Sequence, residues 1–495
     1  MTEHVHVVVV GAGFGGVAAA ARLLADGVDS LVVLERGDAV GGVWRDNVYP
    51  GAACDVESNL YELAAAPNGD WSRRFAPQPE IQAYLERTAD ALGVTPHLRL
   101  GTTVEHAAWD ADALHWVIDT DRGRLTAAVL VAAPGGLAEP RMPDIPGLDT
   151  FQGETMHTSR WRDDVALEGK RVAVVGTGAS AAQVVPPVQR VARELVLFQR
   201  TAPWVIPRRD KPIADRTRRR LAGAGWMKRA VRGALYARHE VLGLAFRHPR
   251  LAAVAEAALA RRHLRKQVAE PALRAVLTPD FRLGCKRLIL SDDYYPALAA
   301  DNATVVDGAL VEVRKHSGVG ADGIERPLDV LVFATGFHVH DYPFGTLVVG
   351  REGKTLAETW GPSPVAHVGT TVAGFPNFFL IQGPNTGLGH SSVILTAEAQ
   401  VEHVANALGA MRERRLAAVE PTAQAQAAWR DEVDALGEGT VWTAGGCESW
   451  YLDETGRNAA IWPGSVPAFR RRVAPFDPAD YTLTPAHAPR PHVAV

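Results

Sequence analysis

Two adjacent cations, Lys286 and Arg287, interrupt an apolar stretch that runs from Leu283 to Leu290. Charges that enter a buried strand are costly unless they are paired or bind a ligand. Arginine keeps its proton at any physiological pH, so it can stabilise an anion in a site that holds little water. We interpret the dipeptide as part of a ligand or catalytic site; a pair of strand-end charges is the alternative.

The elements that could position such a site begin with a glycine loop near the N-terminus. The run Val7–Val10 predicts a buried parallel strand, and the loop Gly11-Ala-Gly13-Phe14-Gly-Gly16 follows it directly. A helix and a second strand, Leu31–Leu34, complete the unit, which ends at Glu35. The glycines permit a tight turn beside a pyrophosphate, and the acid can bind a ribose. The pattern predicts a Rossmann unit that binds a dinucleotide.

A second unit of this kind begins with the apolar run Lys170–Val175. Its loop reads Gly176-Thr177-Gly178-Ala-Ser180-Ala181, and its second strand, Leu195–Phe198, precedes Arg200 and Thr201 rather than an acid. A carboxylate here would repel a 2′-phosphate, whereas arginine can bind one through two hydrogen bonds. The sequence therefore favours NADPH over NADH. A solvated charge at the strand end is the alternative interpretation of Arg200.

Residues 208–274 have a helical pattern, with 18 Lys or Arg residues against five Asp or Glu. Few aromatic residues accompany the cations, which disfavours a nucleic-acid partner. We predict a solvated helical insertion that borders the substrate pocket. A weak contact with a membrane surface is the second interpretation.

The composition is that of a globular enzyme, with 47% hydrophobic and 22% charged residues and a net charge of -4 over 495 residues. The three cysteines, Cys54, Cys285 and Cys447, lie far apart and form no CxxC pair. The sequence thus predicts neither a disulfide framework nor a metal site. No signal peptide or transmembrane segment is recognised, and a reducing cytoplasm is the expected location.

A short segment between the two glycine loops has the spacing F-x-G-x-x-x-H-x-x-x-W, formed by Phe151, Gly153, His157 and Trp161. The stretch Gly41 to Asp55 matches the pattern [A/G]GxWxxxx[F/Y]P[G/M]xxxD at every fixed position. Together with the two loops, these motifs resemble type I Baeyer–Villiger monooxygenases, which are class B flavoprotein monooxygenases. The resemblance extends to about Pro463.

Two positions depart from the family pattern. Arg162 follows Trp161 where the family usually has proline or aspartate. Pro134 lies where the chain leaves the first dinucleotide-binding unit for the second. The family usually reads Ala-Thr-Gly at this place.

The resemblance implies an α/β fold with two Rossmann-like dinucleotide-binding domains, one for FAD and one for NADP, and a helical insertion in the NADP domain. The expected boundaries are 1–140 and 337–495 for the FAD domain, 141–168 for a linker with the F-G-H-W segment, 169–207 and 281–336 for the NADP domain, and 208–280 for the insertion. If the linker segment is helical, Gly153, His157 and Trp161 share one face. We expect a strut that transmits domain rotation; a catalytic role for His157 is the alternative.

The implied reaction starts when NADPH reduces FAD. Oxygen then adds at the flavin C4a position, and the resulting peroxyflavin attacks a ketone or aldehyde to give an ester or lactone. By the same resemblance, Arg287 is the catalytic arginine, Asp55 pairs with it, and Lys286 is a second contact for the 2′-phosphate. Trp450, near the C-terminus, would close over the substrate.

The expected cofactor contacts form two sets. The FAD set is Gly11, Gly13, Phe14, Gly16, Glu35, Trp44, Asp55, Tyr61 and Asn385. The NADP set is Gly176, Thr177, Gly178, Ser180, Gln183, Arg200, Thr201, Lys286 and Arg287.

Three other functions are alternatives to this interpretation. A flavin monooxygenase that oxygenates nitrogen or sulfur is disfavoured by the Asp55 motif and the Lys286-Arg287 pair. A non-catalytic, NADP-sensing flavoprotein is the second. A flavin disulfide reductase is disfavoured because the chain has no CxxxxC pair.

Overall fold

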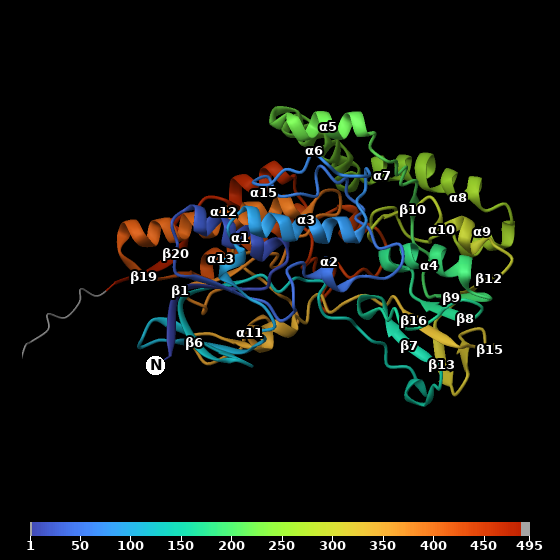
Figure 1. The fold of residues 1–495 in the computed structure, drawn as a ribbon, viewed down its shortest axis with the longest axis horizontal. Helices are drawn as coiled ribbons and strands as arrows, with labels where there is room; N and C mark the ends of the chain where they lie inside the picture. The colour runs from blue at the N-terminus through green and yellow to red at the C-terminus, as the bar shows by residue number, and fades with distance from the viewer. Residues whose placement is uncertain (1, 487–495) are drawn as a thin grey trace, which may run out of the picture.

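The computed structural model describes residues 2–486, and two β-sheets organise this part of the chain (Figure 1). The first sheet has the order β17-β4-β5-β6-β1-β2-β3. Its parallel strands are β3 (Leu98–Arg99), β2 (Leu31–Leu34), β1 (Glu3–Val10), β6 (Gly123–Ala132) and β18 (Phe378–Leu380). The remaining strands are β5 (His115–Thr120), β4 (Val104–Asp110) and β17 (Val348–Val349).

Strand β6 joins the antiparallel ladder of this sheet to its parallel strands. Its first half pairs with β5 in an antiparallel ladder, and its last residues, Leu130–Ala132, pair in parallel with β18. The second part of the chain therefore returns to the sheet that its N-terminus began. The predicted strand Val7–Val10 is the buried end of β1.

Helices cover both faces of the first sheet. On one face, α1 (Phe14–Ala25) packs against α12 (Val393–Arg414), with α3 (Gln78–Ala91) beside α1. The other face is closed by the apolar side chains of β4, β5 and α11 (Leu356–Trp360). The C-terminal part adds the hairpin β19 (Leu416–Pro421) and β20 (Tyr481–Pro485), and the helices α13 (Ala423–Gly437), α14 (Val441–Ala444) and α15 (Val466–Val473).

The second sheet is entirely parallel. Its order is β12 (Ala303–Asp307), β9 (Glu194–Gln199), β8 (Arg171–Val175), β16 (Val330–Phe333) and β7 (Glu154–His157). The helices α4 (Ala179–Val191) and α10 (Tyr294–Leu298) cover one face. A small antiparallel sheet of β13 (Leu310–Arg314), β14 (Ser317–Gly320) and β15 (Glu325–Pro327) covers the other. This second sheet is buried on both faces, as a parallel sheet requires.

The insertion between β9 and β12 is helical, as predicted from its sequence pattern. It contains α5 (Asp215–Gly223), α6 (Gly225–Arg247), α7 (Pro249–Ala255), the π-helical segment η4 (Glu256–Arg261), α8 (Arg262–Gln267) and α9 (Pro271–Val276). Figure 1 shows α5 and α6 lying above α3 and α15, so the insertion reaches over the first sheet's helices.

Two local features differ from the sequence pattern. The condition that the F-G-H-W segment is helical is not met, because Glu154–His157 forms the edge strand β7 and Thr158–Arg160 forms a short 3₁₀ turn, η3. The strand expected at Lys286 begins only at Ile289, where β11 (Ile289–Leu290) pairs with β10 (Val205–Ile206). The two cations therefore lie in the turn before a strand.

The prediction that the cysteines form no disulfide was wrong. Cys285 and Cys447 are bonded, with their Cα atoms 6.1 Å apart, across a sequence separation of 162 residues. The sequence did not reveal the pair because the turn before β11 and the loop after α14 meet only in the folded chain. The cytoplasmic location stays a prediction, without the support that unpaired cysteines would have supplied.

No helix within residues 2–486 is long and apolar enough to cross a membrane. The same part of the chain holds no cluster of three or more His, Cys, Asp or Glu side chains placed to bind a metal ion.

Candidate active site between the two sheets

The first glycine loop has the geometry that a dinucleotide pyrophosphate needs. Gly11 adopts a φ of +97°, and a Cβ atom there would lie 2.4 Å from the carbonyl oxygen of Ala133. Helix α1 begins at Gly13 without a side-chain cap, so its first N–H groups remain available to a phosphate. Glu35 accepts hydrogen bonds from the N–H groups of Ala12 (2.8 Å) and Gly37 (2.7 Å). The acid is thus held directly beside the loop, as the sequence predicted.

Three aromatic side chains lie at the start of this helix. The Phe14 ring meets the Tyr61 ring edge-on at 5.1 Å, and the Trp44 ring meets Tyr61 at 5.7 Å. The Trp44 indole N–H also donates to the Tyr61 hydroxyl at 3.0 Å. The cluster is half-buried and offers flat apolar surfaces next to the glycine loop, which suits a planar ring system.

The second glycine loop repeats this arrangement at the start of α4. Gly176 has a φ of +116°, and a Cβ atom there would lie 2.4 Å from the carbonyl oxygen of Ala334. Gly178 faces open space, and the helix again lacks a side-chain cap. The Thr177 hydroxyl donates to the carbonyl of Thr201 at 2.8 Å, which joins the loop to the end of β9.

Two cations meet beside the second loop. Arg200 is exposed at the end of β9, and Lys286 is half-buried in the turn before β11. Burial lowers the pKa of Lys286, and the positive charge of Arg200 lowers it further. Neither cation forms an ion pair with an acidic side chain in the described region, residues 2–486. Two neighbouring charges of like sign without an acidic partner suit a phosphate dianion.

The decisive contact joins the two units directly. Arg287 donates from Nε to one oxygen of Asp55 at 3.0 Å and from a terminal nitrogen to both oxygens, at 2.8 and 2.6 Å. The residues are 232 positions apart in the chain. The negative charge of Asp55 raises the pKa of Arg287, so the guanidinium keeps its proton. The predicted partners thus meet in a bidentate ion pair.

A second link lies on the same side. The Tyr49 hydroxyl donates to Oε1 of Gln183 at 2.8 Å, and Nε2 of Gln183 donates to the carbonyl of Ala53 at 2.8 Å. The Tyr49 oxygen is also 3.4 Å from the Ser180 hydroxyl. Gly51 permits this approach, since a Cβ atom there would lie 2.5 Å from the carbonyl of Gln183. Ser180 and Gln183 thus contact the flavin-side loop of the first unit.

The F-G-H-W segment lies where the chain passes between the sheets. A Cβ atom on Gly153 would clash with the Phe151 ring at 2.6 Å, so only glycine fits there. His157 is buried, accepts a hydrogen bond on Nδ1 from the N–H of Ser159 (3.1 Å), and packs edge-on against Phe337 at 5.6 Å. Burial lowers the pKa of His157 to about 4, so the ring is neutral at neutral pH. This packing supports the strut interpretation.

Comparison with known proteins gives a consistent result. The model of the flavin-binding monooxygenase-like family matches residues 4–213. A Baeyer–Villiger monooxygenase of Streptomyces coelicolor is 49% identical, with 98% of this chain and 94% of that protein covered. A Baeyer–Villiger monooxygenase of Pseudomonas aeruginosa is 41% identical, with 97% and 92% covered. The chain belongs to the Baeyer–Villiger monooxygenase family.

Solved structures extend this family assignment to the fold. An oxidised steroid monooxygenase bound to NADP superposes with a TM-score of 0.86 and 32% identity, with 98% of this chain and 100% of that chain covered. An OTEMO complex with FAD and NADP superposes with a TM-score of 0.88 and 27% identity over the same shares. The two Rossmann-like domains with a helical insertion are therefore the fold of this family member.

Two predicted site residues, Asn385 and Trp450, lie in the C-terminal part of the chain. Asn385 has a φ of +59°, and its amide is bonded within the protein, to the carbonyl of Asn458 (2.6 Å) and the guanidinium of Arg457 (2.9 Å). Trp450 is 40% exposed, whereas its neighbour Tyr451 is buried. Burial raises the pKa of Tyr451 to about 12, and the charges of Arg287 and Asp55 also act on it. Tyr451 is therefore a buried aromatic side chain within electrostatic reach of the ion pair, as Tyr61 is.

Sequence reasoning missed how the insertion is anchored. Glu57, two residues beyond Asp55, lies 2.7 Å from Nε2 of His239 on α6. Nδ1 of His239 donates to the carbonyl of His390 at 2.5 Å. Burial lowers the pKa of His239. No local pattern marks Glu57, because its role depends on a helix that begins 168 positions later at Gly225.

Proposed function

We propose that this chain is an FAD-dependent monooxygenase that uses NADPH and O2 to insert one oxygen atom into a ketone or aldehyde. In the overall reaction, the carbonyl compound, O2, NADPH and a proton yield an ester or lactone, NADP⁺ and water. The observation that carries the proposal is the bidentate Arg287–Asp55 pair. It places a permanent cation at the junction of the two dinucleotide-binding units.

The residues at the first loop fit FAD. The uncapped start of α1, from Gly13 with Gly11 and Gly16, would hold the pyrophosphate, and Glu35 would accept from the adenosine ribose. Phe14, Trp44 and Tyr61 would line the path toward the flavin ring, with Asp55 and Asn385 in the surrounding shell. Bound FAD supplies the electron storage and oxygen activation that no side chain provides.

The second loop would hold NADPH. Gly176, Thr177 and Gly178 would face the pyrophosphate at the start of α4, with Ser180 and Gln183 further along that helix. Arg200, Thr201 and Lys286 would bind the 2′-phosphate, because the two cations act on each other there and neither forms an ion pair with an acid within residues 2–486. Arg287 would lie near the nicotinamide end.

The chain's own contribution to catalysis is a fixed positive charge. Arg287 cannot act as an acid near neutral pH, since Asp55 raises its already high pKa. Its role is therefore to stabilise negative charge on the reacting oxygen while Asp55 holds the orientation of the guanidinium. Tyr451 bounds the same space and would limit access of water and substrate.

We also propose the division of the chain predicted from the sequence. Residues 1–140 and 337–495 would form the FAD domain, and residues 169–207 and 281–336 the NADP domain. The linker 141–168 would transmit movements between them through Phe151, Gly153, His157 and Trp161. The insertion 208–280 would border the substrate pocket.

A substrate panel tests this function. Purified enzyme with FAD is supplied with NADPH, O2 and either a cyclic ketone, an aldehyde or a thioether, and the products are examined by mass spectrometry. We expect oxygen-dependent NADPH consumption, and a ketone-derived lactone that is heavier by one oxygen atom. Sulfoxide formation with no lactone would replace the proposal by heteroatom oxygenation. No substrate-dependent turnover would point to a non-catalytic flavoprotein.

A further inference from the structure

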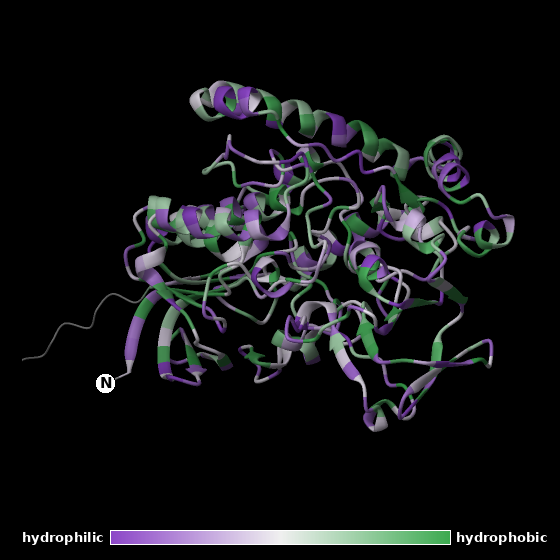
Figure 2. Ribbon diagram, turned by 45° about the vertical axis from the view of Figure 1, so that its right-hand side comes forward, coloured by the Kyte–Doolittle hydropathy of each residue, from purple (hydrophilic) through white to green (hydrophobic). Residues whose placement is uncertain are grey.

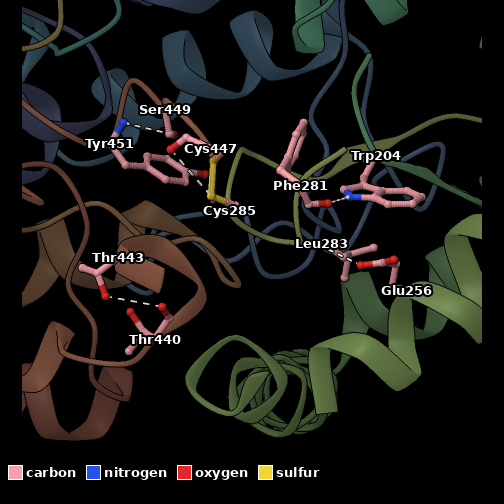
Figure 3. The surroundings of a disulfide bond; sticks show 10 residues. All are labelled: Trp204, Glu256, Phe281, Leu283, Cys285, Thr440, Thr443, Cys447, Ser449 and Tyr451. Atoms are coloured by element: carbon pink, nitrogen blue, oxygen red, sulfur yellow. Dashed lines mark hydrogen bonds between the residues drawn. A yellow bond between two sulfur atoms is a disulfide. The ribbon is translucent and has the colours of Figure 1, made fainter. Parts of the chain in front are cut away.

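We propose that the Cys285–Cys447 disulfide positions Arg287 and Tyr451 for the reaction. Cys285 lies two residues before the arginine, and Cys447 lies four residues before the tyrosine. Figure 3 shows the bond beside Ser449 and Tyr451. The inference rests on the proposed function and adds to it the covalent link that holds two parts of the active site together.

The two bonded segments have little regular structure to hold them. Residues 283–288 form the turn before β11, and residues 445–451 form the loop after α14. The N–H of Arg282, directly before the turn, donates to the carbonyl of Gly445 at 3.0 Å. A covalent link between segments with so little regular structure strongly restrains their relative position.

The packing around the bond is close. A Cβ atom on Gly445 would lie 2.7 Å from Sγ of Cys285. A Cβ atom on Gly284 would lie 2.3 Å from the Phe246 ring of α6. Trp204 fixes the other end of the segment, since its indole N–H donates to the carbonyl of Phe281 at 2.7 Å (Figure 3). The disulfide thus joins a well-anchored segment to the start of a loop whose far end is held at Tyr451, which is buried and accepts from the N–H groups of Ala459 and Ala460.

Reduction is the direct perturbation of this link. Two equivalents of a small thiol reduce the bond by exchange, which leaves two cysteine thiols and one small-molecule disulfide, so that two electrons are transferred. Cys285 is buried but Cys447 is half-buried, so the bond can be reached from the loop side. The start of the loop would then lose its covalent link to the Arg287 segment, and only packing and hydrogen bonds would hold Tyr451 in place.

The first measurement is a thiol count on the complete, FAD-loaded enzyme after denaturation. We expect one reactive thiol, that of Cys54, without prior reduction, and three after reduction with dithiothreitol. Three thiols in the unreduced enzyme would overturn the proposal, because the bond would be absent.

The second measurement compares oxidised and reduced wild-type enzyme, with the Cys285→Ser/Cys447→Ser double variant as control. We expect reduction to raise the KM for the ketone and to lower product formed per NADPH by about threefold or more, while NADPH still reduces the flavin at a similar rate. The double variant should behave like the reduced enzyme and should not respond to dithiothreitol.

The outcomes separate this inference from the proposed function. Identical coupling and ketone KM in the oxidised and reduced enzymes would overturn the positioning role while leaving the function intact. A lower thermal midpoint with unchanged coupling and KM would also overturn it, because the bond would then be purely structural. If the oxidised enzyme forms no lactone at all, the proposed function itself fails.

A separate observation concerns the outer face of the insertion. We infer that α6 and α7 form a docking surface for anionic lipid membranes. Seven of the exposed large hydrophobic side chains lie between residues 226 and 259, namely Trp226, Val241, Leu242, Leu244, Leu251, Val254 and Leu259. Trp226, Val241 and Val254 are each about two-thirds exposed. In Figure 2 the helices of the insertion, at the top, carry hydrophobic stretches although they lie at the outside.

Helix α6 carries an apolar stripe on its outer side. At 3.6 residues per turn, one stripe about 80° wide contains Trp226, Ala230, Gly233, Ala237, Val241 and Leu244. The side that faces the protein carries both polar and apolar residues: Arg232 binds Glu398 at 2.9 Å, and His239 binds Glu57. Phe246 on the same side is buried and stacks on Trp442. A surface helix normally buries its apolar residues and exposes its polar ones. Here apolar residues are gathered on the outer side as well, which marks an interaction surface.

The positive charge of the insertion indicates which kind of partner binds this surface. Exposed cations of the insertion that have no acidic ion-pair partner within residues 2–486 are Arg209, Lys211, Arg216, Arg219, Arg220, Arg229, Arg250, Arg262, Arg265 and Lys266. A second copy of the chain would bring another strongly basic surface against this one. An anionic bilayer instead attracts the arginines and accepts the apolar stripe at the boundary between headgroups and acyl chains.

Vesicle co-sedimentation tests this surface with the full chain. We expect binding to phosphatidylcholine vesicles that contain phosphatidylglycerol, at least about fivefold weaker binding to phosphatidylcholine alone, and release by salt. Val241→Asp should abolish binding, whereas Ile324→Asp, on an exposed residue between β14 and β15, should not.

Three results would overturn the inference. They are absence of binding to the anionic vesicles, binding that Val241→Asp leaves unchanged, and a dimer in light scattering that Val241→Asp converts to a monomer without any vesicle binding. The last result would assign the surface to a second copy of the chain.

Discussion

Replacing Arg287 by lysine separates its charge from its geometry. Arginine makes three contacts with the Asp55 carboxylate, between 2.6 and 3.0 Å. Lysine keeps the positive charge but cannot reproduce the planar fork, so at least one contact is lost and the ammonium is free to rotate. A hydrogen bond between charged groups contributes about 1.5–3 kcal/mol. The expected loss in product formation is therefore about 10- to 150-fold.

Replacing Arg287 by alanine removes the charge as well. Removal of a group that stabilises an anion in a preorganised site costs about 10²–10³-fold, and Asp55 is then also left without its partner. We expect Arg287→Ala to form almost no lactone. Flavin reduction at saturating NADPH should continue in both variants, with the consumed oxygen released as hydrogen peroxide.

The assay has two parts. Anaerobic stopped-flow absorbance measures flavin reduction by NADPH, and gas chromatography measures lactone formed per NADPH consumed. Arg171→Lys is the matched control, because Arg171 forms a similar bidentate pair with Asp329, at 2.6 and 3.0 Å, on the second sheet away from the site. That variant should keep the wild-type yield of lactone per NADPH.

Two results would refute the reasoning. Arg287→Ala with a wild-type yield of lactone would show that the cation is not needed. A double-mutant cycle of Arg287→Lys with Asp55→Asn offers the second check, since residues in contact should show a coupling energy of about 0.5–3 kcal/mol. Strictly additive effects would mean that the ion pair does not act as a unit.

The remaining predictions concern NADPH, pH and backbone strain. Arg200→Ala and Lys286→Ala should each raise the KM for NADPH by about 10- to 100-fold and leave that for NADH nearly unchanged, because only NADPH carries the 2′-phosphate; equal losses with both cofactors would contradict this site. The pKa of His157 is about 4 in the folded chain, below its usual 6.5, so the unfolded chain binds more protons between these values and stability falls as pH drops from 6.5 to 4. The loss in the free energy of unfolding reaches about 3 kcal/mol. His157→Gln should therefore reduce the slope of the thermal midpoint against pH. An unchanged slope would show that His157 does not cause this loss. Gly51→Ala should lower the thermal midpoint and the yield of product per NADPH, since its φ is +87° and its Cβ atom would strike Gln183, whereas Gly93→Ala, with a φ of +73° and open space, should cost only about 1 kcal/mol; similar effects of the two would contradict the close contact.

Much of this protein follows from its sequence. Both dinucleotide-binding units were predictable, because glycine loops, apolar strand runs and the residue after the second strand are local features with a direct steric or electrostatic meaning. The helical insertion could also be predicted, because its helical pattern is a local feature of the sequence as well. The family resemblance then implied the partnership of Arg287 with Asp55, which the structure shows as a three-contact ion pair.

The tertiary structure decided what depends on contacts between distant segments. The disulfide joins two loops 162 residues apart, and spacing in the chain carries no signal for such a meeting. Burial, rather than residue type, distinguishes Tyr451 from Trp450 as the side chain beside Arg287. Gly153, His157 and Trp161 are spaced four residues apart, as on one face of a helix, yet Glu154–His157 forms a strand. The pairing of this strand with β16 outweighs the local spacing. The sequence determines the chemistry of each local segment. The packing of the two sheets and the insertion determines which of these segments share a site.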